Sequence, residues 1–264
     1  MNYVVILVLV MALQALAFSA KCGVEGAPPR EEISRRLVKA YTDYLDSADK
    51  TTLIWRDGTR MPLDAAPKLP GSSEWLETPS VADMLRVPYP SGRLTEPPDP
   101  GADPGRARNQ AFFMKMYGDC RSGAVNKDLV DVVWLPKKSG QRLRVTRING
   151  VAEKLQRVSN ELDKLSSKFD RFLIPSAGTY NCRGIAGTDR ISAHGYGIAI
   201  DIAVKNTDYW RWAKPKNGPP KYRNRIPHEI VEVFERHGFI WGGKWHHFDT
   251  MHFEYRPELL PIPR

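Results

Sequence analysis

The stretch Ser192-Ala-His-Gly-Tyr-Gly-Ile-Ala-Ile-Asp201 places a histidine and a carboxylate on one short segment. Near the C-terminus, Asp249-Thr-Met-His-Phe-Glu254 supplies another carboxylate and another histidine. A hydrolytic zinc site takes three ligands from His, Asp, Glu and Cys side chains and leaves a fourth position for water. Together the two segments predict His194, Asp201 and His252 as metal ligands and Asp249 as the base that accepts the proton.

The residues around Asp201 predict the local structure. Ile198, Ile200, Ile202 and Val204 alternate with smaller residues, which is the period of a strand with one apolar face. Asp201 lies on the opposite face, where a buried carboxylate would be costly without a partner charge such as a metal ion.

The turn before this strand contains Gly195 and Gly197, which accept backbone angles closed to other residues and would bring His194 back beside the strand. Residues 251–255 predict a second short strand, with His252 and Glu254 on one face. Glu254 is therefore expected to orient a ligand histidine rather than to bind the metal.

These motifs also carry a family resemblance. Ser-x-His-x-x-Gly-x-Ala-x-Asp followed by Asp-x-x-His-Phe-Glu resembles the zinc D-alanyl-D-alanine carboxypeptidases and L-alanyl-D-glutamate endopeptidases, which cut bacterial cell-wall peptides. The resemblance covers residues 172–256, including the Gly-Phe-Ile-Trp-Gly-Gly-Lys-Trp run. It implies the same ligands and the same base, and one Zn²⁺ per chain.

The resemblance further implies an arginine ahead of the first ligand that positions the substrate. Arg183 is the first candidate and Arg190 the second, because the usual motif spacing is altered here. Ser192 matches the motif serine and would either touch the substrate or brace the turn. His246 and His247 fall at positions that are not ligands, and residues 241–245 are expected to form a pocket wall.

The expected fold is α+β: a small antiparallel sheet carrying a zinc site, flanked by helices as in the hedgehog and D-Ala-D-Ala peptidase proteins, with an N-terminal extension. Residues 1–20 are predicted to be a signal peptide, because their apolar run is too short for a membrane span and ends in small residues. Residues 21–108 are predicted to be an N-terminal arm with a Pro/Gly-rich linker, either separate from the catalytic part or wrapped over it. Residues 109–264 are predicted to be the zinc peptidase domain.

Periodicity predicts further elements along the chain. An Asp-Gly turn at 57–58 predicts a hairpin, and residues 64–108 are expected to be a long loop. The other predicted elements are helices at 31–46, 151–169 and 227–237, hairpin strands at 51–55 and 59–63, and strands at 129–135, 143–148 and 172–174.

The chain has 264 residues, a net charge of +9 and three cysteines. The charge favours anionic surroundings such as wall polymers without excluding a basic protein that has no charge-specific partner. In an exported protein, three cysteines are expected to form one disulfide and leave one cysteine unpaired. We predict the pair Cys120–Cys182, because Cys182 lies beside the site and Cys22 lies near a terminus.

The sequence therefore predicts an exported, periplasmic or extracellular zinc metallopeptidase that cuts peptidoglycan stem peptides, with a D-Ala-D-Ala carboxypeptidase favoured and an L-Ala-D-Glu endopeptidase as the alternative. A monomer without a membrane anchor or nucleic-acid partner is expected. Two other classes stay open. A zinc-stabilised, non-catalytic binding module is one, although the presence of Asp249 speaks against it. A metal-dependent nuclease is the other, suggested by the basic, aromatic segment 205–225 and by the His246-His247 pair.

Overall fold

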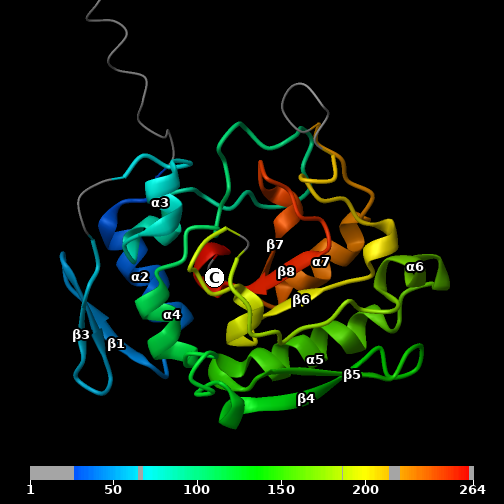
Figure 1. The fold of residues 1–264 in the computed structure, drawn as a ribbon, viewed down its shortest axis with the longest axis horizontal. Helices are drawn as coiled ribbons and strands as arrows, with labels where there is room; N and C mark the ends of the chain where they lie inside the picture. Colours follow the sequence, from blue (N-terminus) through cyan, green and yellow to red (C-terminus); the bar gives the residue numbers. More distant parts are fainter. Residues whose placement is uncertain (1–26, 65–67, 186, 214–220, 262–264) are drawn as a thin grey trace, which may run out of the picture.

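The computed structural model describes residues 27–64, 68–185, 187–213 and 221–261 (Figure 1). Short 3₁₀ turns link the main elements. In chain order these are α2 (Arg30–Ala40), β1 (Leu45–Ala48), β2 (Thr52–Trp55), β3 (Arg60–Pro62), α3 (Ser73–Glu77), α4 (Gln110–Tyr117), β4 (Leu129–Trp134), β5 (Gln141–Thr146), α5 (Val151–Leu162), α6 (Asp170–Leu173), β6 (Ala199–Asp201), α7 (His228–Arg236), β7 (Phe239–Trp241) and β8 (His252–Tyr255).

The central sheet is antiparallel and has the order β6-β8-β7. Its register pairs Ala199 with Glu254 and Asp201 with His252 on β6 and β8. Side chains alternate between the faces of a strand, so these four residues share one face and Ile200 and Phe253 share the other. A single register therefore creates both the polar face and the apolar face of the sheet.

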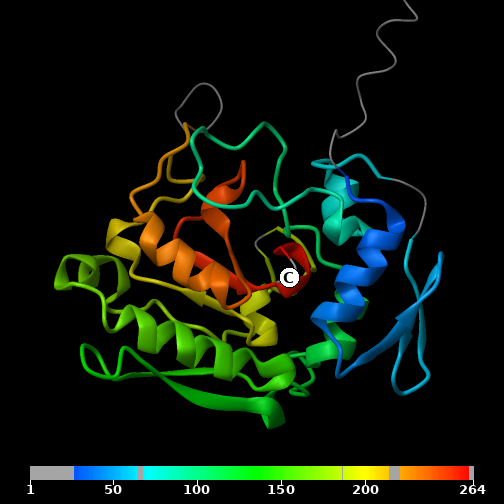
Figure 2. The ribbon, with the colours of Figure 1, turned by 180° about the vertical axis from the view of Figure 1, so that it is seen from behind.

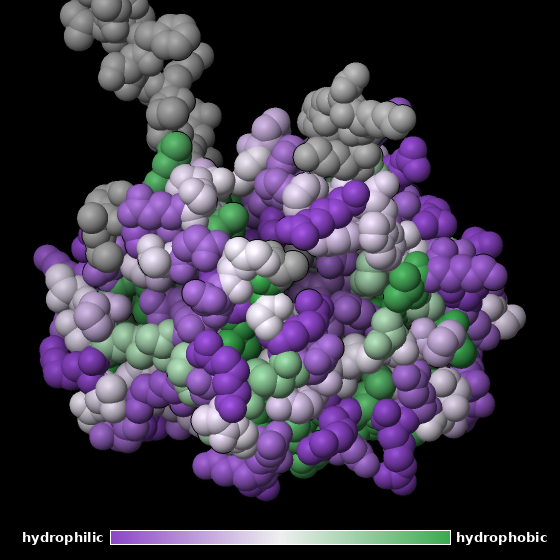
Figure 3. Space-filling model, viewed as in Figure 1, coloured by the Kyte–Doolittle hydropathy of each residue, from purple (hydrophilic) through white to green (hydrophobic). Residues whose placement is uncertain are grey.

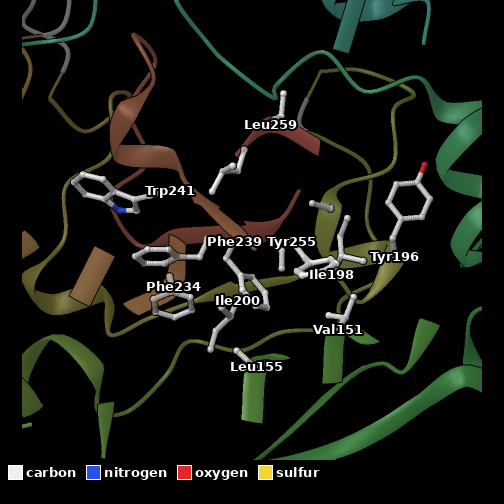
Figure 4. Close-up of a cluster of buried hydrophobic side chains, with 14 of the residues drawn as sticks. Val151, Leu155, Tyr196, Ile198, Ile200, Phe234, Phe239, Trp241, Tyr255 and Leu259 are labelled. Carbon is white, nitrogen blue, oxygen red and sulfur yellow. The ribbon is translucent and has the colours of Figure 1, made fainter. Parts of the chain in front are cut away.

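The apolar face of the sheet is covered by α7 and α5. Helix α7 lies behind the sheet in Figure 1 and in front of it in Figure 2, while α5 runs between the sheet and the β4–β5 hairpin. Phe234 of α7 stacks on Phe253 with ring centroids 3.8 Å apart. Val151 and Leu155 of α5 point towards the central sheet (Figure 4) and are buried. This packing fixes the backbone that carries the polar face.

The N-terminal elements pack on the opposite side of the molecule from α6. Helix α2, the β1-β2-β3 sheet and α4 lie together there (Figures 1 and 2). Their buried side chains belong to the same hydrophobic cluster as those of the central sheet. Tyr41 at the end of α2 donates a buried 2.8 Å hydrogen bond to Glu258. Among the described residues, the core thus runs without a break from α2 to the C-terminal turn.

The segment expected to be a long loop, residues 64–108, packs onto the catalytic part. It contains α3 and a 3₁₀ turn, Ala82–Leu85, and it runs over the top of the molecule in Figure 1. Tyr89 accepts a 2.9 Å hydrogen bond from Trp241 N, and Pro104 O accepts one of 2.6 Å from the Trp245 indole. Of the two arrangements left open, the described residues adopt the wrapped one. The division at residue 108 stays a prediction.

Two helix predictions were too long. The predicted helix 31–46 ends at Ala40 because Leu45–Ala48 instead pairs with β2, and this pairing extends the predicted hairpin to three strands. The predicted helix 151–169 ends at Leu162. The Asp163 carboxylate that follows it accepts hydrogen bonds from the backbone of Lys137 and Lys138, in the loop of the β4–β5 hairpin.

Two strand predictions also change. Residues 172–174 were predicted as a strand, but Phe172 and Leu173 end α6, where Ile174 N donates to Asp170 O at 2.9 Å. The predicted strand 198–204 is restricted to Ala199–Asp201, and Val204 begins a 3₁₀ turn with 42% of its surface exposed.

The other predicted helices and strands form, with ends that differ by up to two residues. The 129–135 and 143–148 strands form the β4–β5 hairpin, and the Asp-Gly turn closes β2 and β3, with Gly58 at a positive φ of 83°. The predicted helix 227–237 is α7. The predicted disulfide joins Cys120 to Cys182. The α+β class with a small antiparallel sheet carrying the candidate site is also confirmed.

The surface shown in Figure 3 is mainly hydrophilic, with small separate hydrophobic areas. No helix in the described part of the chain is long and apolar enough to cross a membrane. The predicted signal peptide, residues 1–20, and Cys22 lie outside the described residues.

Candidate metal centre

The polar face of the central sheet brings together the three predicted ligands. Asp201 ends β6 directly opposite His252, the first residue of β8. His194 enters on a 3₁₀ turn, Ala193–Tyr196, which ends at Gly197 with a positive φ of 69°. A side chain at Gly197 would meet Thr146 N at 2.9 Å, so both the backbone angle and the space require glycine there.

The ligand atoms of these residues converge on one point. Asp201 Oδ1 lies 3.2 Å from His194 Nε2 and 3.0 Å from His252 Nδ1, and the two ring nitrogens are 3.2 Å apart. Among the described residues this is the one group of three or more His, Cys, Asp or Glu side chains that could hold a metal ion. The geometry therefore combines the three residues that the motif predicted.

The remaining nitrogen of each imidazole has a hydrogen-bond partner. His194 Nδ1 lies 2.5 Å from Thr179 O, and His252 Nε2 lies 3.1 Å from Glu254 Oε2. A metal-bound histidine almost always donates its other N–H to a carbonyl or a carboxylate, which fixes the tautomer and the ring orientation. Both rings are therefore held with the nitrogen that faces Asp201 free to bind a cation.

Glu254 is the centre of a buried ionic network. It is fully buried and accepts hydrogen bonds from both Arg108 and Arg256. Arg256 in turn bonds Glu258 at 2.5 Å, and Glu258 bonds Tyr41 of α2. Alternate residues from 252 to 258 thus connect a candidate ligand to the N-terminal helix.

The electrostatics of the group favour a cation. Burial would raise the pKa of Asp201, but hydrogen bonds from His194 and His252 hold that pKa far below its usual range. Burial opposes a charged imidazole at His252, yet its bonds to Asp201 and Glu254 raise its pKa to about 10. Without a metal, a proton on His252 therefore supplies the positive charge that the carboxylates attract.

Asp249, the predicted base, lies beside this group. The backbone N–H of His252 donates to Asp249 O at 3.2 Å. The side-chain Oδ1 is buried and has no hydrogen-bond partner among the described residues. Burial, together with the nearby charge of Asp201, raises the pKa of Asp249 to about 6 against the opposing effect of His252. An unpaired buried carboxylate oxygen next to a metal-ligand group is suited to accept a proton near neutral pH.

Arg183 is exposed and lines a hollow of about 200 Å³ that also contains His194 and Asp201. Residues 177–181 also line the hollow, and one of them is Thr179, whose carbonyl holds His194. The Cys120–Cys182 bridge fixes the end of this segment to the region after α4. The disulfide therefore holds one wall of the candidate site.

The other two predicted substrate residues are placed differently. Ser192 is buried, and its hydroxyl accepts from the backbone N–H of His194 at 3.4 Å, so it braces the turn. The Arg190 side chain is 12% exposed and faces Glu77 of α3, with Nε 3.4 Å from Glu77 Oε1.

Within the segment 241–245, which was expected to form a pocket wall, the Trp245 ring centroid lies 5.5 Å from that of His252. The pocket wall itself stays a prediction. His247 binds Asp103 through Nδ1 at 2.6 Å, and neither His246 nor His247 joins the ligand group.

Sequence reasoning missed Arg106, Arg108 and Asp103. All three belong to the Pro/Gly-rich segment 64–108, whose composition indicates only a loop. They reach the site through tertiary packing, and their spacing in the sequence does not indicate that packing. Thr179 was missed as well, because its backbone carbonyl rather than its side chain serves His194.

Comparison with known proteins identifies the region that holds these residues. Residues 186–255 match the model of a D-alanyl-D-alanine carboxypeptidase family, which confirms the resemblance seen in the sequence. The matched stretch covers about a quarter of the chain and contains all three ligand candidates, Asp249 and Glu254. The similarity to a peptidase family therefore falls on the segment that carries the candidate metal centre. No curated protein matches the chain.

Proposed function

We propose that this chain is an exported zinc metallopeptidase that hydrolyses peptide bonds in bacterial cell-wall stem peptides. A D-Ala-D-Ala carboxypeptidase is the favoured activity, and an L-Ala-D-Glu endopeptidase using the same site is the alternative. The observation that carries the proposal is the convergence of His194, Asp201 and His252 within 3.2 Å beside the unpaired oxygen of Asp249, inside the family-matched region.

Zinc fits the donor set. Two imidazoles and one carboxylate are ligands that Zn²⁺ takes, and three protein ligands leave room for water, as in catalytic zinc sites. The hydrogen bonds to Thr179 O and Glu254 support the ring nitrogens that would bind the metal. When bound, zinc supplies a Lewis acid and a water whose pKa is lowered to about 7.

The chain's own residues then carry the proton and orient the peptide. Asp249 accepts the proton of the attacking water and returns it to the leaving amine. Arg183, in the hollow beside His194, holds a substrate carboxylate or steadies the developing oxyanion, because its planar fork matches a pair of oxygens. Ser192 keeps the His194 turn in place.

Export is supported by two features. The matched family is named for D-alanyl-D-alanine, the end of the proposed wall substrate, and a disulfide persists in oxidising compartments outside the cytosol. The apolar residues 1–20 would direct the chain there as a signal peptide. A periplasmic or extracellular location follows from the proposed substrate.

Digestion of purified wall peptides tests the proposal. The mature chain, an Asp249→Asn variant and a chelator-treated sample would each be incubated with stem peptides, and the products identified by mass. We expect metal-dependent loss of one terminal alanine. Release between L-Ala and D-Glu would establish the endopeptidase instead.

Two results would move the assignment to another class. Zinc binding without any product from wall peptides would favour a non-catalytic binding module. Metal-dependent cleavage of DNA at low salt, with no peptide product, would favour a nuclease.

A further inference from the structure

Three arginines meet beside the candidate metal centre, and two of them lie outside the family-matched region. Arg106 and Arg108 come from the segment after Asp103, whereas Arg190 comes from the loop before His194. The side chains of the three are 21%, 10% and 12% exposed. Burying several like charges together is costly unless each has a counter-charge. The partners of each arginine therefore indicate whether the cluster is complete.

Arg108 has a full partner. Its guanidinium makes two hydrogen bonds to the buried carboxylate of Glu254. Glu254 also serves Arg256 and His252, so its charge is already divided among three cations. Arg108 thus stabilises the wall behind His252 and offers little to a ligand. Glu254, in turn, does not compensate the charges of Arg106 and Arg190.

Arg106 has a shared partner and lies over Trp245, which packs on a candidate ligand. It binds Asp103 at 3.0 Å, but the same carboxylate accepts from His247 through both the ring and the backbone. Its guanidinium lies over the Trp245 ring, 5.7 Å from the centroid, and Trp245 packs on His252. Its charge also acts on Asp249, where it offsets a part of the increase in pKa that burial causes.

Arg190 has the weakest partner of the three. The nearest carboxylate oxygen to its Nε is Glu77 Oε1 at 3.4 Å, on a side chain that is 44% exposed. This Nε is buried and makes no well-directed hydrogen bond within the described residues. Burial, followed by the charges of Arg108 and Arg106, lowers the pKa of Arg190. Among the three arginines, Arg190 therefore has the least compensation of its charge by a carboxylate.

We propose that Arg106 and Arg190 form an anion subsite that binds a carboxylate of the peptide substrate next to the scissile bond. The proposal rests on the proposed function for the identity of the substrate. It gives the N-terminal segment a share in this specificity, because Arg106 lies outside the matched region whereas Arg190 lies within it. An anionic oxygen pair satisfies guanidinium donors that have no complete partner, and charge-assisted bonds of this type are roughly twice as strong as neutral ones.

Two carboxylates of a wall peptide could occupy this subsite: the C-terminal one, or the α-carboxylate of the γ-linked D-Glu. Derivatives of one parent peptide, N-acetyl-L-Ala-γ-D-Glu-L-Lys-D-Ala-D-Ala, distinguish the two carboxylates. One derivative has a C-terminal carboxamide and the other a carboxamide on D-Glu. Each is titrated calorimetrically into the zinc-loaded Asp249→Asn chain, which should bind without cleaving.

We expect one of the two amide derivatives to bind about tenfold more weakly than the parent peptide, because it loses a charge-assisted pair. In the Asp249→Asn background, Arg106→Gln and Arg190→Gln should each bring the ratio of the two affinities, parent peptide over amide derivative, closer to one. Weakening by the C-terminal amide would identify a carboxypeptidase subsite, and weakening by the D-Glu amide would identify an internal one.

Matched controls separate ligand binding from structure. Glu77→Gln removes the partner of Arg190, so it should keep or increase the carboxylate preference. If Arg190 served only to hold Glu77, the Glu77→Gln and Arg190→Gln variants would behave alike. Arg142→Gln, at an exposed pair with Asp131 on the β4–β5 hairpin, controls for loss of one positive charge.

The proposal is overturned if both amides bind as tightly as the parent peptide, or if the preference survives both arginine substitutions. These outcomes do not depend on turnover. A wild-type chain that cleaves no wall peptide would sink the proposed function, whereas the binding ratio would still decide on the subsite.

Discussion

His252 Nε2 lies 3.1 Å from Glu254 Oε2, so a fully buried carboxylate stands directly behind the second histidine of the candidate metal centre. The two residues are neighbours on one face of β8. Glu254 also bonds Arg108 and Arg256. Burial raises the pKa of Glu254, but Arg108 and the other partners outweigh this effect and hold the pKa well below its usual range. A permanently ionised carboxylate at this position keeps the proton on Nε2 and leaves Nδ1 for the metal.

Replacing this carboxylate should weaken metal binding. Outer partners of metal-bound histidines typically contribute 10–100-fold in affinity, so we expect Glu254→Gln to lower zinc affinity by about that factor in a chelator competition. Glu258→Gln is the matched control, because it removes a charge from the same buried network without touching His252. Equal zinc affinities for the two variants would contradict the assigned role of Glu254.

Asp249→Asn should separate chemistry from binding. The amide has the shape of the carboxylate but does not accept the proton, so we expect peptide hydrolysis to fall by about 10²–10⁴-fold. Zinc content, measured by elemental analysis, should be unchanged. Retained hydrolysis at the wild-type rate would exclude Asp249 as the base.

The pH dependence of the wild-type rate should reflect the same residue. Asp249 must be ionised to act, and its pKa is about 6 in the metal-free chain. A nearby zinc ion favours the ionised form, so the acidic limb of the rate profile should lie at or below about pH 6, with activity falling as the pH decreases. A rate that is constant down to pH 4 would contradict this.

Metal binding should release a proton from the chain at neutral pH. The pKa of His252 is raised to about 10, because Asp201 and Glu254 outweigh the effect of burial, whereas zinc requires the neutral imidazole. We expect release of about one proton at pH 7 and an affinity that increases with pH up to about 10. Calorimetry in buffers of different ionisation enthalpy measures this number directly. Identical heats in all buffers would mean that His252 is already neutral.

The same shift has a consequence for stability. The folded pKa of His252 lies above its unfolded value of 6.5, so the ion pair stabilises the metal-free fold fully below about pH 6.5. That contribution is lost as the pH rises towards 10. Urea unfolding of metal-free protein at pH 6 and pH 10 should show this loss, and His252→Gln should reduce it. An equal loss in that variant would point to other groups.

Breaking the disulfide should destabilise the chain and loosen one wall of the site. The bridge spans 62 residues of sequence, for which loop-closure entropy gives about 4 kcal/mol of unfolding free energy. We expect the Cys120→Ser/Cys182→Ser double variant to lose up to that amount in denaturant unfolding. It should also lose activity, since Cys182 ends the segment that holds His194. A variant with unchanged activity would show that this segment is held by its other contacts.

The sequence by itself predicted the residues of the candidate metal centre and the type of fold. The Ser-x-His-x-x-Gly-x-Ala-x-Asp and Asp-x-x-His-Phe-Glu motifs specify local geometry, because a glycine turn followed by a strand of period two places His194 and Asp201 on one side. The existence of the periodic helices and of the hairpin with the Asp-Gly turn was predicted for the same reason, although two helices end earlier than predicted. Their conformations depend on residues close in sequence.

The tertiary structure decided what the N-terminal segment contributes. Arg108 and Arg106 reach Glu254 and Trp245 across about 140 residues of sequence, and neither the composition nor the spacing of residues 64–108 indicates these contacts. Leu45–Ala48 becomes a strand because β2 offers it a partner, whereas Phe172 and Leu173 belong to α6. Such outcomes depend on packing free energy between distant segments, which local sequence patterns do not contain.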